Sequence, residues 1–432
     1  MAWLSAAKSA QNNLPPDRFC TNRQKCYKIK RLGNFSRRES THMLNLELST
    51  FYGDFEELDA LSRLLEPFNE QTRALVKTKR MHWMTSWSEL ISVASLGSGP
   101  DISQIGNTWI SSLTGLNAIR PFKPSESQAM GGDLLFPNAE TPNPCWSIPW
   151  TIYAFVICYR KDHFAEKGID PASAFSSQAA TIETIQKLGE AWLTPFVPNP
   201  YPDMLHIAAS WVWGNGGELV AYKNNRPQIV FDQPAAIQGF SNWLESYRAV
   251  PASHRLNGRD CMGLFQQGKA SAVVSGMRMA NTLLASADEK TIENIGFAPI
   301  SSMPWVGGDS LVLWKHSQRE AEREKVALEL VKFLTSKENV IQFCQAANSL
   351  PARQDALDTL YPSSHPLHET VQAISKSGRR YPAINEWRSI EHQLVQELDT
   401  IVHEAYRNPA QTSQEIVEKR LHPLAQRLNR TM

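Results

Sequence analysis

Residues 44–51, LNLELSTF, alternate leucine with polar residues and predict the first strand of the fold. The following segment predicts a helix, whose apolar face is formed by Leu58, Leu61, Leu65 and Phe68. Ser86 and Glu89 then form a capping-box pattern at the start of a second helix. Residues 101–105, DISQI, predict a second strand. The order β-α-α-β at the start of the chain therefore predicts an α/β sheet.

Strands, helices and loops alternate through the rest of the chain. The predicted strands are WTIYAFVICYR (150–160), QIVF (228–231), SAVVSG (271–276), IGFAPI (295–300) and SLVLW (310–314). Helical patterns occupy 181–192, 202–213, 234–247, 317–334 and 338–347. A long late helix carries an apolar stripe made of Ile384, Trp387, Ile390, Leu394, Leu398 and Ile401. Thr412 and Glu415 predict the capping box of a final helix.

Composition sets the class of protein. The 432 residues are 42% hydrophobic and 20% charged, which suits two globular domains. Residues 1–42 contain nine Lys/Arg and two Asp/Glu, whereas the rest contains 35 and 41. We therefore expect residues 1–43 to be a separate, poorly ordered basic segment. The excess of acidic residues after residue 42 gives no support for a nucleic-acid-binding surface.

The chain shows no sequence that predicts a membrane-spanning helix. Apolar runs such as residues 154–158 fall short of the roughly 18–20 residues that such a helix needs.

Signatures of catalysis, cofactors and metals are missing. The chain has no GxxxxGK[ST], GxGxxG after a strand, HExxH or GxSxG, so no cofactor is expected. Six scattered cysteines and eleven dispersed histidines predict no metal site. Cys20 and Cys26 leave a pair or a metal site open, and we expect the four later cysteines to be small buried side chains. A glycosidase needs two carboxylates facing each other in space, and no motif indicates that pair.

Tryptophan positions are more informative. Several of the 13 tryptophans fall at predicted element ends and loops: Trp109, Trp146, Trp150, Trp211, Trp213, Trp305 and Trp387. Flat aromatic faces at such places suit stacking on sugar rings. In ASWVWGNGGELV (209–220), Asn215, Gly216 and Gly217 are predicted to end a helix in left-handed conformations. Trp213, next to this turn, is predicted to contact a ligand, and Trp211 to pack in the core.

An ordered set of segments resembles extracellular solute-binding proteins of family 1, the maltose-binding-protein-like receptors of sugar importers. The segments are GSGPDISQIGNTWISSL (97–113), SIPWTIYAFVICYRKDHFAEKGID (147–170), WVWGNGGELV (211–220), FQQGKASAVVSGMRM (265–279), PWVGGDSLVLWKHS (304–317) and VALELVKFLTSKENVIQFCQAANSLPAR (326–353). The resemblance covers roughly residues 44–430. It departs from the family at residues 276–278, where an arginine stands in place of an aromatic platform.

The resemblance implies a two-lobe periplasmic-binding-protein-like fold of class II, each lobe a mixed sheet flanked by helices, with the ligand cleft between the lobes. Lobe one is predicted at 44–151 plus 300–340, and lobe two at 152–299 plus 341–432. Closure of the lobes would be a population shift that a ligand touching both lobes stabilises.

The resemblance also implies the cleft residues. These are Tyr52, Gly53, Asp54, Asn107, Thr108, Trp109, Trp150, Tyr153, Trp213, Gly216, Gly276, Arg278, Gly307, Gly308, Asp309 and Trp387. Within this set, Trp109, Trp213 and Trp387 are expected to stack on sugar rings. Hydroxyl groups are expected to bind Asp54, Asn107, Arg278 and Asp309. For Trp387 a place in the apolar stripe of its helix is an equal alternative.

The implied function is that of a substrate-binding component of an ABC importer. It would capture an oligosaccharide or a glycosylated small solute and deliver it to the transmembrane subunits of a permease, with no enzymatic step. We expect a monomer in the periplasm, or anchored to the membrane on its outer side, although residues 1–42 contain no apolar stretch typical of an export signal. A ligand-binding sensor of the same fold and a carbohydrate-active enzyme remain alternatives.

Overall fold

The structure is a computed structural model that describes residues 43–51, 55–83, 85–130, 134–135, 144–196, 201–250 and 256–432. Residues 1–42 separate from residues 43–432 as a unit of their own. The predicted basic segment, apart from Met43, and the pair Cys20 and Cys26 therefore lie outside the described residues.

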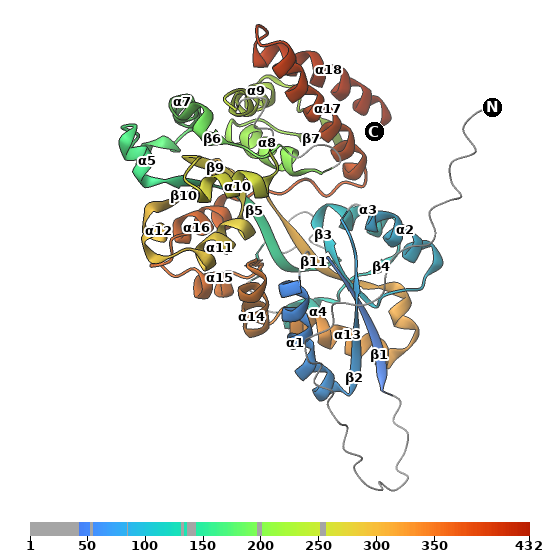
Figure 1. Cartoon of the computed structure of the whole chain (residues 1–432). Helices are drawn as coiled ribbons and strands as arrows, with labels where there is room; N and C mark the ends of the chain where they lie inside the picture. Colours follow the sequence, from blue (N-terminus) through green and yellow to red (C-terminus); the bar gives the residue numbers. More distant parts are fainter. Residues whose placement is uncertain are drawn as a thin grey trace, which may run out of the picture. The chain divides into compact units, whose positions relative to one another are not determined.

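The first part of the chain alternates strands and helices (Figure 1). Its elements are β1 (Leu44–Thr50), α1 (Phe55–Thr72), β2 (Ala74–Arg80), α2 (Ser86–Leu96), β3 (Ile102–Gly106), η1 (Asn107–Trp109), α3 (Ile110–Gly115), β4 (Ile119–Arg120) and α4 (Pro124–Ala129). The predicted β-α-α-β opening was wrong in one respect, because β2 lies between the two helices. Its sequence, ALVKTKR, has only two buried residues, so the apolar alternation is short.

The middle of the chain begins with the long predicted strand. Its elements are β5 (Ile148–Arg160), α5 (Lys161–Glu166), α6 (Pro171–Ala174), α7 (Gln178–Leu188), η2 (Gly189–Ala191), β6 (Trp192–Leu193), α8 (Asp203–Gly214), β7 (Val220–Lys223), β8 (Arg226–Ile229), α9 (Pro234–Arg248), α10 (Gly258–Gln266), β9 (Ala272–Gly276), α11 (Met277–Ser286), α12 (Glu289–Asn294) and β10 (Ile295–Pro299).

The last part returns to the first sheet and then becomes helical, as predicted. Its elements are β11 (Val306–Trp314), η4 (Lys315–Arg319), α13 (Ala321–Leu334), α14 (Lys337–Ala347), β12 (Leu350–Pro351), α15 (Gln354–Leu360), α16 (His368–Ser377), α17 (Trp387–Arg407) and α18 (Ser413–Thr431). Thr412 forms the predicted capping box with Glu415. The one predicted at Ser86 was wrong, because the Ser86 hydroxyl accepts from the backbone N–H of His82 at 2.7 Å.

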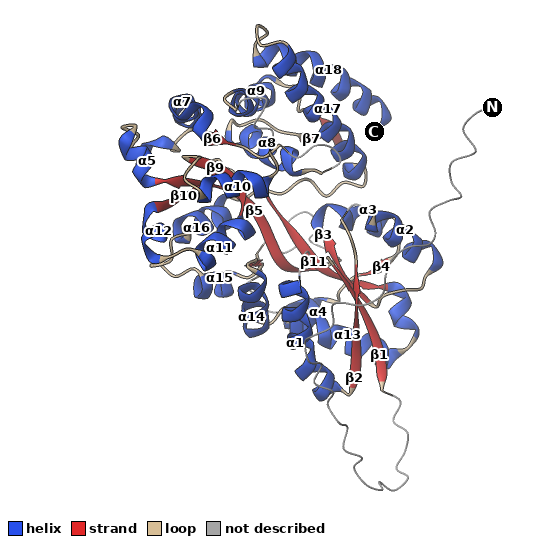
Figure 2. Cartoon of the chain, in the orientation of Figure 1, coloured by secondary structure: helices blue, strands red, loops and turns tan. Residues whose placement is uncertain are grey.

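The strands pair in the order β2-β1-β3-β11-β5-β9-β6, with β4 beside β11 and with β10 and β12 beside β5. β1 is parallel to β2 and β3, whereas β11 runs antiparallel to β3 and β5. Residues 148–154 of β5 pair with β11, and residues 155–159 pair with β9. β5 therefore continues from one half of the sheet into the other (Figure 2).

Helices cover both faces of the first half of the sheet, because alternate strand residues point to opposite sides. On β11, Leu311 and Leu313 pack with α1, α13 and α14, whereas Val312 and Trp314 pack on the other side with α2 and α3. We call the first group the α1 cluster and the second the Trp109 cluster, after the residue that lies in it. Both faces of β11 are apolar for this reason.

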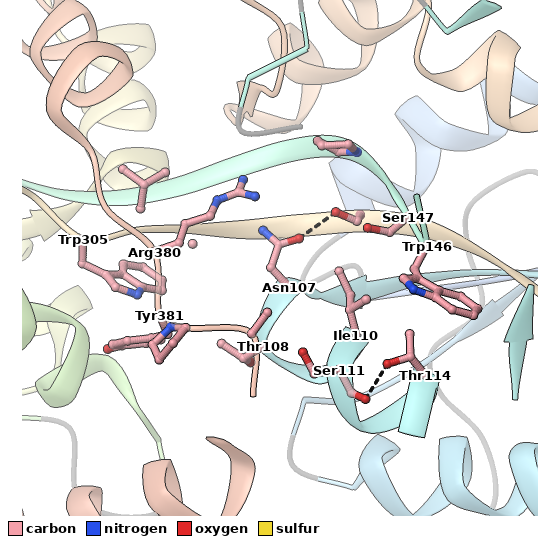
Figure 3. Close-up of a pocket in the computed structure, with 16 residues that line it drawn as sticks. Asn107, Thr108, Ile110, Ser111, Thr114, Trp146, Ser147, Trp305, Arg380 and Tyr381 are labelled. Carbon is pink, nitrogen blue, oxygen red and sulfur yellow. Dashed lines mark hydrogen bonds between the residues drawn. The ribbon is translucent and has the colours of Figure 1, made fainter. Parts of the chain in front are cut away.

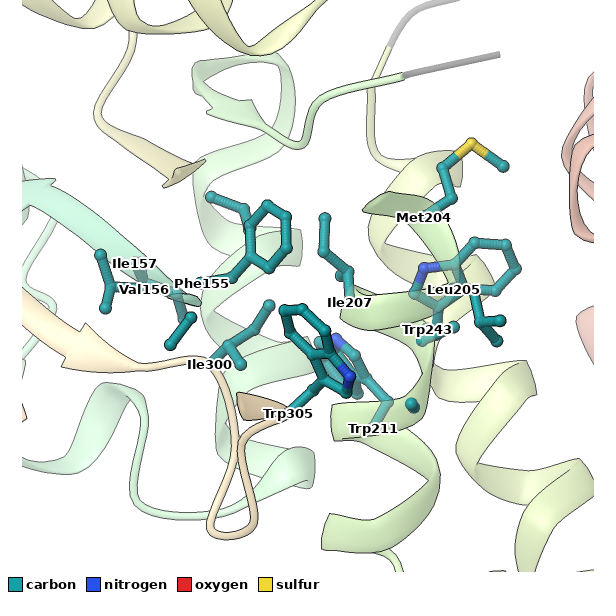
Figure 4. Close-up of a cluster of buried hydrophobic side chains, with 14 of the residues drawn as sticks. Phe155, Val156, Ile157, Met204, Leu205, Ile207, Trp211, Trp243, Ile300 and Trp305 are labelled. Atoms are coloured by element: carbon teal, nitrogen blue, oxygen red, sulfur yellow. The ribbon is translucent and has the colours of Figure 1, made fainter. Parts of the chain in front are cut away.

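The second half has a larger core that we call the α8 cluster. It contains β5 from Ile152 onward, most of α8 and α9, and the apolar stripe of α17. Figure 4 shows part of it, with Phe155 of β5, Ile207 and Trp211 of α8, and Trp305 from the loop before β11. Burial of these large side chains provides most of the hydrophobic stabilisation of this half.

The predicted lobe boundaries stay a prediction. Phe343 and Cys344 of α14 pack in the α1 cluster, whereas the prediction assigned them to lobe two. We propose that lobe one extends through α14, because this helix packs mainly against α1. Cys158, Cys261 and Cys344 are buried, as predicted, and Cys145 is partly buried.

Candidate ligand-binding site

A cavity of about 80 Å³ lies where η1 and α3 face the segment that leads into α17 (Figure 3). One water needs roughly 10–15 Å³, so this cavity has room for several. Its walls are Asn107, Thr108, Ile110, Ser111, Thr114, Trp146, Ser147, Pro149, Trp305, Val306, Gly307, Ser310, Arg380, Tyr381, Pro382 and Ala383. Because Leu113 of α3 packs in the Trp109 cluster and Tyr381 in the α8 cluster, both halves of the sheet contribute walls.

Asn107 supplies a buried hydrogen-bond donor in the cavity wall. It follows β3 directly, so the end of that strand places its side chain among the other walls. The amide oxygen accepts a hydrogen bond from the Ser310 hydroxyl at 2.6 Å, whereas the amide nitrogen Nδ2 is buried and has no partner among the described residues. A buried donor without an acceptor costs about 1–3 kcal/mol, which a ligand oxygen would offset.

Aromatic rings form a second part of the wall. Trp305 and Tyr381 lie with their ring centroids 5.9 Å apart, and Tyr381 stacks on Trp387 at 4.4 Å. Trp146 lies on the other side of the cavity (Figure 3). Apolar rings combined with a few directed polar groups are typical of pockets for small organic ligands.

Three charged groups near the cavity belong to β11, α1 and α11. Asp309 accepts hydrogen bonds from Gln104 Nε2 at 2.8 Å and from the Thr151 hydroxyl at 3.4 Å. Burial raises the pKa of Asp309 to about 7; the hydrogen bond from Gln104 opposes this shift and the Glu57 carboxylate adds to it. Glu57 in turn pairs with Arg278, with 2.8 Å between Oε2 and Nη1.

Three of the predicted cleft residues line the cavity: Asn107, Thr108 and Gly307. Tyr52, Gly53 and Asp54 lie outside the described residues. Asp309 is adjacent to Ser310, which lines the cavity, and Arg278 is paired with a carboxylate. This pairing gives the Arg278 guanidinium a protein partner, whereas the sequence prediction assigned it to ligand hydroxyls.

The three tryptophans predicted to stack on sugar rings and the predicted cleft residue Trp150 are packed inside the protein. Trp109, Trp150, Trp213 and Trp387 are each between 1% and 4% exposed. Trp150 stacks on Phe343, and its indole N–H donates to the Leu334 carbonyl. The Trp213 ring lies 5.1 Å from the Arg379 guanidinium and 5.7 Å from the Tyr381 ring. None of the four lines the cavity, although Trp213 and Trp387 lie beside Tyr381, which does.

The other predicted residues serve close backbone packing. A Cβ on Gly276 would lie 2.4 Å from the Tyr153 hydroxyl, and one on Gly308 would lie 2.2 Å from the Thr151 carbonyl oxygen. Tyr153 is near Trp305, with 6.1 Å between ring centroids, and burial raises its pKa. Gly216 is the residue with positive φ in the Asn215–Gly217 turn, whereas Asn215 has a φ of −94°. The prediction of several left-handed residues there was wrong.

Several cavity residues were not predicted. Trp146 and Trp305 carried a signal, because both are tryptophans at predicted element ends. Arg380 and Tyr381 carried none, since they lie in a segment without a motif that the fold brings to β11. Trp83 lies outside the cavity wall; it is 42% exposed, stacks on Phe51 at 3.8 Å and approaches Gly106 at the end of β3.

Comparisons with known proteins identify the family and the fold of the chain. Residues 63–370, more than half of the chain, match the family described as bacterial extracellular solute-binding protein. The chain belongs to this family. The predicted two-lobe α/β fold is confirmed by its likeness to maltose-binding-protein-like structures. No curated protein matches the chain significantly.

Three solved structures illustrate the likeness to this solute-binding protein. The sugar-binding protein MalE from Xanthomonas citri has a TM-score of 0.71 at 18% identity, covering 89% of this chain and 98% of that one. Maltose-bound MalE3 of T. maritima has a TM-score of 0.70 at 18% identity, with 89% and 100% covered. The maltotriose-binding protein of Thermus thermophilus has a TM-score of 0.66 at 16% identity, with the same coverage.

Neither a membrane-spanning helix nor a metal-binding cluster is found among the described residues. Among these residues, the helices are all too short or too polar to cross a membrane. The same part of the chain contains no group of three or more His, Cys, Asp or Glu side chains placed to hold a metal ion.

Proposed function

We propose that this solute-binding protein is the substrate-binding component of an ABC importer and that it captures a carbohydrate in the cavity between η1, α3 and the 380–383 segment. The partners are the transmembrane subunits of the permease, and the protein acts as a monomer outside the cytoplasm. No bond is broken in this function. Membership of the family supports the solute-binding role.

The observation that carries the carbohydrate proposal is the cavity wall itself. It combines the rings of Trp305, Tyr381 and Trp146 with the unpartnered Nδ2 donor of Asn107. Aromatic faces pack on the C–H surface of a sugar, while an amide donor binds a hydroxyl oxygen. The structures that share the fold include proteins bound to maltose, maltotriose, acarbose and tagatose.

A thermal-shift screen of mono-, di- and trisaccharides tests this proposal. A sugar present at 100 times its dissociation constant stabilises the folded state by about 2.7 kcal/mol, which raises the melting temperature measurably. A panel in which no sugar shifts the melting temperature would overturn the carbohydrate proposal.

The cavity itself is tested with Asn107→Asp, which replaces the free donor by an acceptor of the same shape. The Ser310 hydroxyl can still donate to the new side chain, so the fold has little reason to change. We expect affinity for the sugar found in the screen to fall roughly tenfold, in line with a lost and mismatched hydrogen bond. Asn242→Asp, at a site on α9 whose side chain bonds Gln178, is the matched control and should keep the affinity.

A further inference from the structure

Trp305 and Tyr381, two rings of the cavity wall, both contact the same side chain of α8. The imidazole of His206 stacks flat on the Trp305 ring, with 3.7 Å between centroids and 4° between planes. Its Nδ1 atom lies 2.8 Å from the Tyr381 hydroxyl, a hydrogen bond between buried groups. His206 does not line the cavity, so its contacts with the cavity are indirect.

One turn further along α8, Ser210 holds the backbone of the same wall. The Trp305 backbone N–H donates to the Ser210 hydroxyl at 2.8 Å, and the Ser301 hydroxyl donates to the Ser210 carbonyl at 2.7 Å. Residues four apart lie on one face of a helix, so His206 and Ser210 present a ring and a hydroxyl to the same loop. The backbone of Trp305 is therefore anchored, and the face of its ring is covered by His206.

The segment that carries Tyr381 is fastened to the loop that carries Trp305. The Val306 N–H donates to the Arg379 carbonyl at 2.8 Å, and the Arg379 N–H donates to the Pro304 carbonyl at 2.9 Å. These bonds fix the two backbones relative to each other, while the orientation of each ring depends on its side-chain contacts, among them the stack of Tyr381 on Trp387. The contacts of His206 restrict the rotation of both rings at once.

The charge state of His206 is compatible with both of its ring contacts. Burial lowers the pKa of His206 to about 3, so the imidazole is neutral throughout the physiological range. A neutral imidazole has one donor and one acceptor nitrogen, and either tautomer can bond a phenol hydroxyl. Burial likewise raises the pKa of Tyr381 and keeps that hydroxyl protonated.

We propose that His206 is a positioning residue of the ligand site: it sets the orientation of Trp305 and Tyr381 and thereby the affinity for ligand. The inference rests on the proposed function for its effect on binding, while its effect on the rings holds without any ligand. His206 contacts two rings that belong to segments about 75 residues apart in sequence.

The test separates stacking from hydrogen bonding. His206→Phe keeps a flat ring against Trp305 and loses the bond to Tyr381, whereas His206→Gln keeps a polar partner and loses the stack. Tyr381→Phe removes the hydroxyl alone. His163→Phe is the matched control, because His163 bonds Ser271 and does not line the cavity. Melting temperatures identify any variant that fails to fold.

The first measurement needs no ligand. The protein is labelled with 5-fluorotryptophan, and the Trp305 fluorine resonance is assigned as the one missing from Trp305→Phe. We expect this resonance to shift or broaden in both His206 variants and to stay unchanged in His163→Phe. An unchanged Trp305 resonance in folded His206→Gln would overturn the proposal, whether or not any sugar binds.

The second measurement uses maltose, maltotriose and tagatose as probes in titration calorimetry. We expect His206→Phe and Tyr381→Phe each to weaken binding roughly three- to tenfold. The double variant His206→Phe/Tyr381→Phe should lose no more affinity than either single variant, because both substitutions remove the same hydrogen bond. Additive losses, or full affinity in His206→Phe, would overturn the positioning role. If no probe binds the unmodified protein, the carbohydrate proposal is weakened, and the fluorine result alone decides for His206.

Discussion

Asp309 holds a carboxyl group on β11, next to the cavity residue Ser310 and between the side chains of Gln104 and Thr151. Burial raises its pKa to about 7, far above its ordinary value near 4. The folded state therefore binds a proton more tightly than the unfolded chain does. The stabilisation that this proton provides is complete below about pH 4 and is lost as the pH rises through 7.

Asp309→Asn should remove this dependence, because an amide keeps an acceptor for Gln104 and carries no charge. At pH 8 we expect the variant to be more stable than the unmodified protein, by on the order of 4 kcal/mol, since the carboxyl pKa lies about three pH units above its ordinary value. At pH 4 the difference should be small. Urea unfolding at both pH values measures this, and an equal difference at the two values would contradict the assigned pKa.

The residue scale also shows why the tryptophans predicted to bind ligand differ from those that line the cavity. Trp109 sits at an element end, as a ligand-binding residue would, yet it packs against Phe51, Trp83 and Trp87. Trp305 sits at a similar place and lines the cavity. The two cannot be told apart locally, because position at an element end does not decide which neighbours cover a ring.

At the scale of elements, the turn after α8 depends on two adjacent glycines for different reasons. Gly216 has a φ of +76° and open space around its Cβ position. Gly217 has no unusual φ, but a Cβ there would lie 2.6 Å from the Cα of Ala236 at the start of α9. Gly216 permits the left-handed turn, and Gly217 permits the close approach of this turn to the start of α9.

Alanine at each position separates the two reasons. Gly216→Ala should cost about 1 kcal/mol, the strain of a left-handed alanine. Gly217→Ala should cost more, about 2–3 kcal/mol, because backbone has to move away from the new methyl group. The free energy of unfolding in urea gives both values. Equal costs would mean that α9 relaxes freely away from the turn.

At the scale of the whole molecule, the ion pair of Glu57 and Arg278 joins elements that belong to different cores. Glu57 is in the first turn of α1, which packs in the α1 cluster. Arg278 is in the first turn of α11, whose Met277 and Ala280 pack in the α8 cluster. In the predicted division, Glu57 belongs to lobe one and Arg278 to lobe two, so we propose that this pair biases the equilibrium between the arrangements of the lobes without touching the ligand.

Arg278→Gln should therefore weaken binding of every ligand by the same factor, roughly two- to fivefold for a partly exposed pair. A residue that contacts ligand would instead change the ratio of affinities among sugars. Calorimetry with a series of related sugars distinguishes these outcomes. Arg420→Gln, which breaks a pair with Glu404 between α17 and α18, is the control and should leave all affinities unchanged.

Sequence alone was sufficient for most of the elements. Alternation in β1, the apolar stripe of α17 and the capping box of α18 are set by contacts between residues two to four apart, and these spacings are visible in any window of the chain. The short polar strand β2 was missed because its pairing with β1 identifies it better than its own pattern does. The ordered family motifs supplied the two-lobe fold.

The cavity was decided by the tertiary structure. Asn107 and Ser310 are 203 residues apart, and His206 and Tyr381 are 175 apart. The family resemblance could nominate Asn107, Thr108 and Gly307, because the motifs that carry it include these residues. Sequence could not assign Tyr381 to the wall or Trp150 to the core, because burial and partners depend on which distant segments pack together. Local periodicity determines elements, and only their packing determines which side chains share a cavity.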